Sequence, residues 1–373
     1  MGTGRKPKLS VYKTTNDAGV AVVKALFVGL GSIGQRHLRN LRTIVGESLE
    51  ASAWRVTKTV PLLDGKGNAE LGVDLAHHYQ ILEFERLQDA LENKPSIVFV
   101  CNPNSLHVEV AQAAIDAGCD VFIEKPVSHS AAGIARLIQS ANATSRIVAV
   151  GFQYRFHPGF QQAKLWLNEN RIGQFASASF INGEYIPGWH PYEDYSASYG
   201  ARSDLGGGAL VSQIHEIDMA YDMFGLPERV YAVGDRHSRL ELDVEDSVTL
   251  LLRTMINGRN VPIDIHLDYL QSPPVRRFTI VGDKGRIVWD EQAQSVTLEE
   301  IDGGDVHEFN YPEFDRNDMF MDEMRDFLTA VEKRGRPLVD IETGSESLRI
   351  ALAAQLSMKS GDAYRPVDWQ ESN

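Results

Sequence analysis

The first third of the chain alternates short apolar runs with amphipathic segments, and this alternation restricts the folds that it can adopt. The apolar runs are too short for helices and rich in β-branched residues, so we expect strands at 25–30, 51–56, 97–101, 121–123 and 147–150. Helical patterns separate them at 32–44, 105–117 and 130–141. Strands joined through helices form right-handed crossovers. Residues 22–150 are therefore predicted to fold as a doubly wound parallel sheet of the α/β class.

Beyond residue 150 the pattern changes to longer alternating runs separated by turn signals. Strands are expected at 229–235, 247–255, 261–270, 277–281, 286–289 and 295–299, and helices at 209–223, 318–332 and 345–358. These runs predict a second domain, residues 151–373, of the α+β class with a large open, mostly antiparallel sheet of five or six strands. Its last helix is able to pack back on the first domain. Residues 1–21 are expected to form an N-terminal tail.

Charge and cysteine content exclude several classes of function. The chain has 37 Lys and Arg against 51 Asp and Glu, a net charge of −14. An acidic surface repels phosphate backbones, so we expect no nucleic-acid partner. Two cysteines without a Cys/His cluster indicate neither a disulfide framework nor a metal site. Because no apolar run is long enough for a membrane span or a signal peptide, we expect a cytoplasmic protein with no membrane partner.

A glycine-rich turn connects the first predicted strand to the first helix. It reads Gly29-Leu30-Gly31-Ser32-Ile33-Gly34. In this strand–turn–helix context Gly29 allows the tight turn, Gly31 lets the backbone approach a pyrophosphate, and Gly34 allows close packing of helix and strand. The amides of Ser32 and Ile33 open the helix, whose N-terminus attracts anions. The sequence therefore predicts a dinucleotide site.

The end of the second predicted strand bears on which dinucleotide is bound. An acidic residue at this point binds the ribose of NAD, but this chain has Arg55, followed by Thr57 and Lys58. Cationic and hydroxyl side chains suit a ribose 2′-phosphate. We therefore expect NADP(H) to be favoured over NAD(H); the alternative is that these are solvated charges at a strand end.

A lysine follows the predicted strand at 121–123, in the sequence Glu124-Lys125-Pro126. The carboxyl ends of parallel strands face the ligand crevice in a doubly wound sheet, so Lys125 should point towards the nicotinamide. A desolvated lysine near other cations can exchange a proton during a reaction.

Taken together, the motifs resemble those of the Gfo/Idh/MocA family of NAD(P)-dependent oxidoreductases, named after glucose-fructose oxidoreductase and inositol dehydrogenase. The resemblance covers about residues 24–360. The motifs, in family order, are the glycine turn, Cys101-Asn102-Pro103-Asn104 with His107, Ala117-Gly118, Glu124-Lys125-Pro126, Gly151-Phe152-Gln153-Tyr154-Arg155-Phe156, and Gly206-Gly207-Gly208-Ala209-Leu210 with His215 and Asp218.

The resemblance implies an N-terminal Rossmann domain and a C-terminal domain whose open sheet builds homodimers or homotetramers. It implies that Lys125 is the proton-transfer residue and that His215 helps to hold the reacting hydroxyl or carbonyl. Asn102 and Pro103 would line the nicotinamide site, with His107 and Glu124 also on the cofactor side. Tyr154 and Arg155 would reach the substrate.

One position departs from the family pattern. Where the family commonly has an acid three residues before the histidine, this chain has Ser212, which can bind a hydroxyl but cannot act as a carboxylate. On one helix, Ser212, His215 and Asp218 would share a face, so Asp218 could orient His215; alternatively it is a surface acid. The long aromatic loop at 185–205, which contains Trp189, is expected to contact a sugar ring or to pack the domain junction.

These observations favour an NAD(P)-dependent oxidoreductase that transfers a hydride between nicotinamide and a hydroxyl or carbonyl carbon of a sugar, polyol or nucleotide sugar. Two alternatives stay open. One is a hydrolase or lyase that retains its cofactor and oxidises its substrate transiently. The other is a non-catalytic regulator that senses a dinucleotide; Lys125 and His215 argue against it, and Ser212 argues weakly for it.

Overall fold

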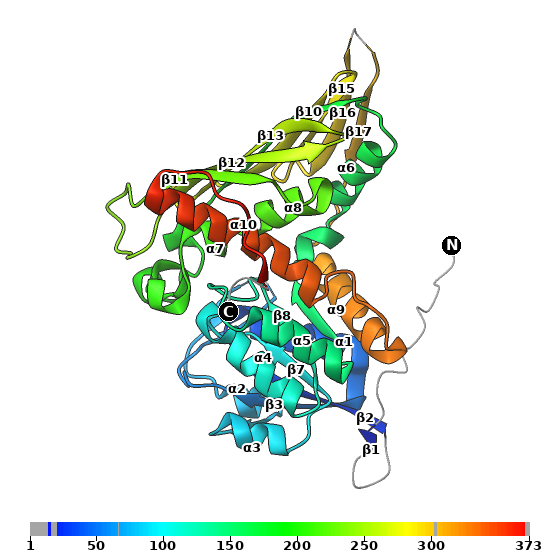
Figure 1. The fold of residues 1–373 in the computed structure, drawn as a ribbon. Helices are drawn as coiled ribbons and strands as arrows, with labels where there is room; N and C mark the ends of the chain where they lie inside the picture. The colour runs from blue at the N-terminus through cyan, green and yellow to red at the C-terminus, as the bar shows by residue number, and fades with distance from the viewer. Residues whose placement is uncertain (1–13, 16–20, 66, 302–303, 370–373) are drawn as a thin grey trace.

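The structure of the protein is a computed structural model that describes residues 14–15, 21–65, 67–301 and 304–369. Most of the predicted tail, residues 1–13 and 16–20, lies outside the described residues. The short strand β1 (Thr14–Thr15) pairs antiparallel with the start of β2. Figure 1 shows two sheet-containing halves, with the helices α9 and α10 between them.

The N-terminal half is the predicted parallel sheet. Its strand order is β6-β3-β2-β7-β8-β9, and every pair along this path is parallel. The strands are β2 (Ala21–Val28), β3 (Leu49–Trp54), β6 (Leu82–Phe84), β7 (Ile97–Val100), β8 (Asp120–Glu124) and β9 (Val148–Gly151). The helices are α1 (Ser32–Val45), α2 (Leu75–Tyr79), α3 (Leu87–Glu92), α4 (His107–Asp116) and α5 (Ile134–Thr144).

The strand order reverses direction beside β2, which lies between β3 and β7. Such a reversal opens a crevice at the carboxyl ends of the strands, where ligands of doubly wound folds bind. The first glycine of the turn, Gly29, directly follows β2 at this point. A small hairpin, β4 (Leu62–Leu63) with β5 (Ala69–Glu70), follows β3.

The C-terminal half contains an eight-stranded sheet of order β11-β12-β13-β10-β14-β15-β16-β17. All neighbours are antiparallel except β10 and β13. The strands are β10 (Phe175–Gly183), β11 (Arg229–Asp235), β12 (Ser247–Ile256), β13 (Arg259–Asp268), β14 (Val275–Gly282), β15 (Gly285–Asp290), β16 (Ser295–Glu300) and β17 (Val306–Asn310). The open, mostly antiparallel sheet is confirmed.

The predicted strand number for this sheet was too low. The sequence pattern missed β10 and β17, as well as the helix α6 (Pro158–Asn168). Small residues fill most of β10, and only intermediate and exposed positions alternate along β17. Neither strand therefore has the strong apolar alternation that marks its neighbours.

The predicted helix at 209–223 is interrupted. It consists of α7 (Ala209–Ser212) and α8 (His215–Phe224), separated by Gln213 and Ile214. Ser212 and His215 therefore do not lie on one continuous helix, which corrects the expectation of a shared face. A break here leaves the carbonyl oxygen of Ser212 free for a partner from the other half of the molecule.

Short 3-10 helices occupy the connections. They are η1 (Gly46–Ser48), η2 (Asn104–Leu106), η3 (Gln153–Phe156), η4 (Ile186–Gly188), η5 (Tyr195–Ala197), η6 (Tyr199–Ala201) and η7 (Ser203–Leu205). The last four lie in the aromatic loop. No helix among the described residues is long and apolar enough to cross a membrane.

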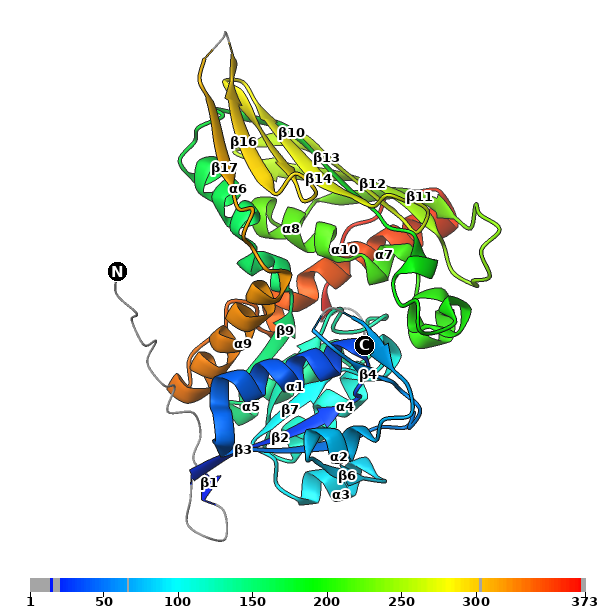
Figure 2. The same ribbon diagram turned by 180° about the vertical axis from the view of Figure 1, so that it is seen from behind.

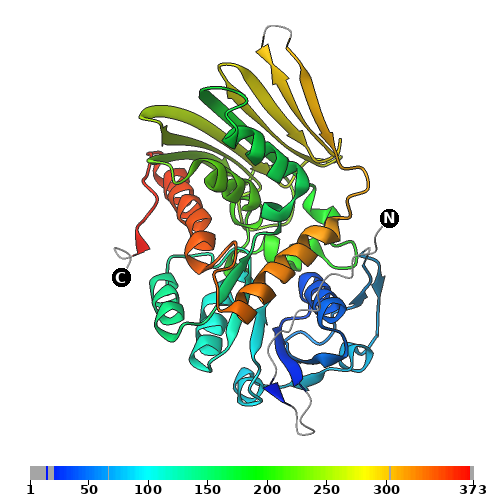
Figure 3. The same cartoon turned by 90° about the vertical axis from the view of Figure 1, so that its right-hand side faces the viewer.

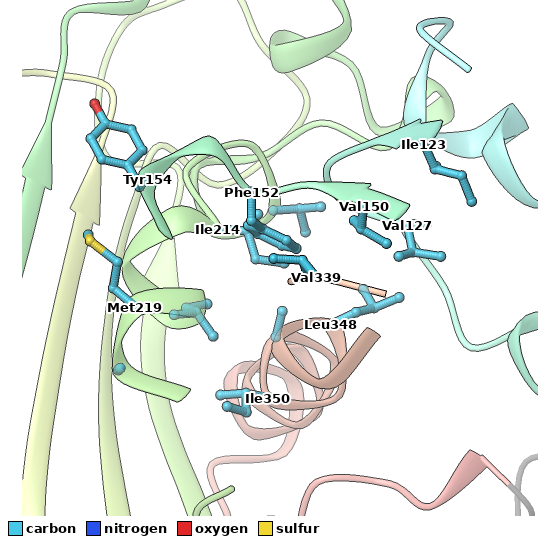
Figure 4. Packing of buried hydrophobic residues seen from close by; sticks show 14 of the residues in the cluster. Ile123, Val127, Val150, Phe152, Tyr154, Ile214, Met219, Val339, Leu348 and Ile350 are labelled. Atoms are coloured by element: carbon cyan, nitrogen blue, oxygen red, sulfur yellow. The ribbon is translucent and has the colours of Figure 1, made fainter. Parts of the chain in front are cut away.

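Helices α6, α8 and α10 (Ile341–Ser360) lie on one side of the eight-stranded sheet, as Figures 1 and 2 show. The packing is continuous across the two halves. One buried cluster includes Ile123 and Val150 of the parallel sheet, Ile214 beside α8, and Leu348 of α10 (Figure 4).

Helix α9 (Arg316–Lys333) returns to the N-terminal half and packs along α1, where Figure 3 shows it in orange beside the blue helix. Asn317 at its start accepts a hydrogen bond from Arg36 at 3.0 Å and exchanges hydrogen bonds with Asn40. The backbone also pairs Ala149 with Asp340. Both C-terminal helices therefore help to hold the two halves together.

Candidate active site

The glycine turn has the geometry that a dinucleotide requires. Gly29 has φ +93°, and a Cβ there would lie 2.7 Å from the carbonyl oxygen of Cys101. A Cβ on Gly34 would lie 2.2 Å from the carbonyl oxygen of Gly29, whereas one on Gly31 would meet no atom within 4 Å. Gly34 is therefore needed for packing, and the space at Gly31 is open towards a ligand.

The amides at the start of α1 are available to an anion. Gly31 is the N-cap of α1, and no side chain caps the helix. Helix ends normally find side-chain or ligand partners for these amides. Ser32 and Ile33, the first two helical residues, are both partly exposed. The turn thus fits the pyrophosphate of a dinucleotide.

Arg55 and Lys58, the cations predicted to bind a 2′-phosphate, have an acidic partner that does not lie at the end of their own strand. Glu83, on β6, accepts hydrogen bonds from Arg55 at 2.9 and 3.2 Å and also contacts Lys58. Burial acts to raise the pKa of Glu83, but the hydrogen bonds from Lys58 and Arg55 hold this pKa below its ordinary value. Arg55 is only 8% exposed, whereas Thr57 is exposed. The acid lies beside the strand end, on the neighbouring strand.

The segment after β7 is the one predicted to line the nicotinamide. Both polar atoms of the Asn102 amide are buried and have no hydrogen-bond partner among the described residues. Buried polar groups without partners are rare, so this amide fits a ligand. Pro103 follows it and is the N-cap of η2. His107 is fully buried, and its ring nitrogens lie 2.7 Å from the backbone carbonyl oxygen of Asn102 and 2.8 Å from that of Pro126. His107 therefore holds the loop in place.

Lys125 follows β8 directly, at the carboxyl edge of the parallel sheet. Its Nζ donates a hydrogen bond to the carbonyl oxygen of Ser212, 2.8 Å away. Burial lowers the pKa of Lys125; Glu124 opposes this shift and Arg276 adds to it. Proton transfer by a lysine requires such a lowered pKa.

His215 opens α8 next to this lysine. Burial lowers the pKa of His215 well below its ordinary value, and the charge of Lys125 acts in the same direction. The imidazole is therefore neutral. Its Nε2 lies 3.3 Å from the Gln153 amide nitrogen, and its Nδ1 has no partner among the described residues. The hydroxyl of Ser212 is also buried, and the side chain of Tyr269 interacts with it.

Arg155 and Asp218, both predicted to bind substrate, bind each other. The guanidinium of Arg155 donates two hydrogen bonds of 2.8 Å to the Asp218 carboxylate and one of 2.6 Å to Asp222. Arg155 and Asp218 are 5% and 1% exposed. The structure thus joins Asp218 to Arg155 and shows no hydrogen bond from it to His215.

The ring of Tyr154 lies next to that of His215, with 5.0 Å between the two ring centroids. Its hydroxyl donates to Glu291 at 2.8 Å, and Arg276 contacts the same hydroxyl. Burial raises the pKa of Tyr154 far above its ordinary range. Tyr154 is therefore a neutral wall of the site.

Arg276 on β14 is a site residue that the sequence analysis missed. It is 6% exposed and donates to Glu216 at 2.8 Å, with Glu184 and Glu291 also within ion-pair distance. Although burial acts in the opposite direction, these carboxylates raise the pKa of Arg276 well above its ordinary value. The alternation of β14 could have found it, because Arg276 occupies an inward position of that strand.

The aromatic loop at 185–205 lies over the site. Trp189 packs edge-on against Tyr269, and its indole nitrogen is buried without a partner among the described residues. Tyr192 interacts through its side chain with Ser32 of the glycine turn. The loop thus reaches from the C-terminal half to the start of α1.

No group of three potential metal ligands occurs in the described part of the chain.

Comparison with known proteins agrees with this geometry. Residues 23–152 match the model of the oxidoreductase family with an NAD-binding Rossmann fold, and residues 170–368 match the C-terminal alpha/beta domain of the same family. The chain therefore belongs to the Gfo/Idh/MocA oxidoreductase family. The family resemblance and both fold classes predicted from the sequence are confirmed.

Several relatives are dehydrogenases of small carbohydrates. Myo-inositol 2-dehydrogenase of Thermotoga maritima is 27% identical over 349 residues, which are 89% of this chain and 95% of that protein. Levoglucosan dehydrogenase of Pseudarthrobacter phenanthrenivorans is 26% identical, with 70% and 72% covered.

Solved structures share the fold. A levoglucosan dehydrogenase in complex with NADH and levoglucosan superposes with a TM-score of 0.77 at 18% identity and covers 93% of this chain and all of that one. The WlbA dehydrogenase of Bordetella pertussis, in complex with NADH and UDP-GlcNAcA, gives 0.74 at 19% identity with the same coverage.

Proposed function

We propose that the protein oxidises or reduces one carbon of a sugar, polyol or nucleotide sugar, with Lys125 as the proton-transfer residue. The observation that carries the proposal is the position of Lys125 at the carboxyl end of β8, hydrogen-bonded to Ser212 across the crevice and next to His215. The dehydrogenase names of the relatives support the same reaction class.

The bound nicotinamide would supply the hydride acceptor or donor, held by the glycine turn and by Asn102. The residues of the chain would handle the proton. In the oxidation direction, neutral Lys125 removes the proton of the substrate hydroxyl, because its lowered pKa makes the amine available. Neutral His215 has a ring nitrogen without a partner among the described residues, and this nitrogen and the buried Ser212 hydroxyl would orient the substrate hydroxyl.

We propose a carbohydrate as the substrate. Trp189 and Tyr195 of the loop pack against the small apolar cluster around Ile186 and Tyr269 and remain partly exposed. The exposed part of these rings would stack on a sugar ring. Relatives act on inositol and levoglucosan, and one structural neighbour holds a nucleotide sugar.

For the cofactor we propose a preference for NADP(H) over NAD(H). Arg55 and Lys58 share one carboxylate, Glu83, and Thr57 is exposed beside them. Two cations and a hydroxyl would meet a 2′-phosphate. NAD(H) is the second candidate, because Glu83 already pairs with both cations and the structural neighbours contain NADH.

We also propose that the open face of the eight-stranded sheet forms a homodimer or homotetramer. Tyr231 and Leu251 face each other across β11 and β12 on that side and are 42% and 49% exposed. No helix of the described residues covers this face in Figures 1 and 2. Exposed apolar sheet faces of this kind favour association.

The experiment that tests the function is a screen of inositols, sugars and nucleotide sugars with NAD⁺ and NADP⁺, followed by absorbance of the reduced nicotinamide. A dehydrogenase produces reduced cofactor in proportion to the substrate consumed. Cleavage of a glycosidic bond without net reduced cofactor would instead support the cofactor-retaining hydrolase or lyase. Dinucleotide binding without any turnover would support the regulator.

A further inference from the structure

We infer that His37 is a positioning residue for proton transfer and that it acts on Lys125 through the carboxylate of Glu124. The inference rests on the proposed function of Lys125. No motif in the sequence analysis pointed to His37, which lies on α1, three residues beyond Gly34.

The His37–Glu124 contact is short and fully enclosed. The His37 ring is 0% exposed, and its Nε2 donates to Glu124 Oε1 at 2.5 Å. The ring lies against Phe99, Phe122 and Phe320, with centroid distances of 4.9 to 6.2 Å. A buried carboxylate needs hydrogen-bond donors, and His37 is the side chain that donates to Oε1 of Glu124.

Glu124 in turn fixes the backbone of the lysine. Glu124 is the last residue of β8, and its Oε2 accepts a hydrogen bond of 3.2 Å from the backbone N–H of Lys125. A Cβ on Gly151 of the neighbouring strand would lie 3.2 Å from Glu124 Oε1, so the absence of a side chain there makes room for the carboxylate. The orientation of Lys125 therefore depends on a carboxylate that His37 holds.

The same contact connects the cofactor to the reacting group. The N-terminus of α1 carries the proposed pyrophosphate amides, and the following turn of this helix carries His37. The buried hydrogen bond ties the helix that seats the cofactor to the strand end that carries Lys125. Small displacements between reacting groups cost large factors in rate, so this tie sets the relative position of the two parts.

The charge of Glu124 also acts on Lys125. Among the charges that affect Lys125, Glu124 is the strongest factor that keeps its pKa from falling further through burial. Other charged or titratable groups face the pair. Around Glu124 these are Arg36, Cys101, His107, Tyr199 and Glu323; around Lys125 they are Glu184, His215, Glu216 and Arg276. Loss of the His37 hydrogen bond leaves Glu124 without its side-chain donor, so its carboxylate is held less firmly beside Lys125 and the pKa of Lys125 falls.

The test compares His37→Leu, which removes the donor, with His37→Gln, which keeps an amide donor near the position of Nε2. Two readouts are needed: the pH dependence of Lys125 acetylation by acetic anhydride, followed by mass spectrometry, and the pH profile of kcat. His37→Leu is expected to move the Lys125 titration to lower pH and to reduce kcat about tenfold or more, whereas NADH binding changes little. His37→Gln should restore both, and Glu124→Gln should move the titration in the same direction as His37→Leu.

An unchanged Lys125 titration in both His37→Leu and Glu124→Gln would overturn the inference, as would a loss in His37→Leu that His37→Gln does not restore. If His37→Leu does not fold, Glu124→Gln and His37→Gln decide the matter. Acetylation does not depend on turnover. A wild-type protein that oxidises no carbohydrate would therefore refute the proposed function while the positioning of Lys125 is still measured.

Discussion

The Nζ of Lys125 donates a 2.8 Å hydrogen bond to the backbone oxygen of Ser212, and this contact joins the parallel sheet to the interrupted helix of the other half. The oxygen is available because α7 ends at Ser212. The chain thus positions its lysine with a backbone group at the residue where the family commonly has an acid.

We expect Lys125→Ala to lower turnover by about 10²–10⁴-fold, which is the usual contribution of a general acid or base. Cofactor affinity should change little, because the pyrophosphate amides lie on α1 and not on β8. Steady-state kinetics and a titration of NADH fluorescence would measure the two effects. Near wild-type turnover in this variant would refute the role of Lys125.

Ser212→Ala should have a much smaller effect. The substitution removes a hydroxyl whose interaction is with the side chain of Tyr269, and it keeps the carbonyl oxygen that contacts Lys125. We expect a loss of about 0.5–1.5 kcal/mol in transition-state binding, the value of one neutral hydrogen bond. The pH–rate profile should keep its ionisations. Abolished turnover here, with Lys125→Ala near wild type, would make the serine the central group.

Arg55 and Glu83 form a matched pair of tests for cofactor preference. Arg55→Ala should weaken NADP(H) binding by about 1.5–3 kcal/mol, the value of a charge-assisted contact, and NAD(H) binding less. Glu83→Gln should strengthen NADP(H), since it frees Arg55 and Lys58 from their carboxylate. Calorimetric titration of each variant with NAD(H) and with NADP(H) measures these changes in affinity. Equal losses for NAD(H) and NADP(H) in Arg55→Ala would contradict the preference.

Oligomerisation is tested on the open sheet face. Leu251→Glu introduces a charge opposite Tyr231 and should convert the assembly to monomers, because burying an unpaired carboxylate at an interface is unfavourable. Leu71→Glu, at a residue that is 75% exposed in the other half, is the control. Light scattering at micromolar concentration should show monomers for Leu251→Glu and the wild-type assembly for Leu71→Glu. A monomeric wild-type protein would refute the proposal.

His157 should make stability depend on pH. Its Nδ1 accepts hydrogen bonds from the backbone N–H groups of Gly159 at 3.1 Å and Phe160 at 3.4 Å, which caps α6. Burial lowers the pKa of His157 from 6.5 to about 4. As the pH falls, His157 is protonated in the unfolded chain before it is protonated in the folded protein. The stabilisation that His157 contributes is therefore complete above pH 6.5 and is lost as the pH falls to about 4.

The expected loss is on the order of 3 kcal/mol over this pH range. His157→Asn keeps a capping acceptor that does not titrate, so its stability should fall less between pH 6.5 and 4. Urea unfolding at several pH values, with wild type and variant side by side, measures the difference. Identical pH dependence of the two proteins would show that His157 does not contribute.

The sequence by itself determined the parallel sheet, the glycine turn at Gly29 to Gly34 and the place of Lys125 at a strand end, because each depends on local patterns of apolar residues and turn formers. Only the tertiary structure decided which side chains pair with the candidate site residues. Glu83 reaches Arg55 from a neighbouring strand, and Asp218 binds Arg155 from 63 positions along the chain. The helix break at Ser212 depends on the same physics, since a buried carbonyl or charge is stabilised by whichever partner the packing brings within hydrogen-bond distance. Spacing along the chain does not contain that information.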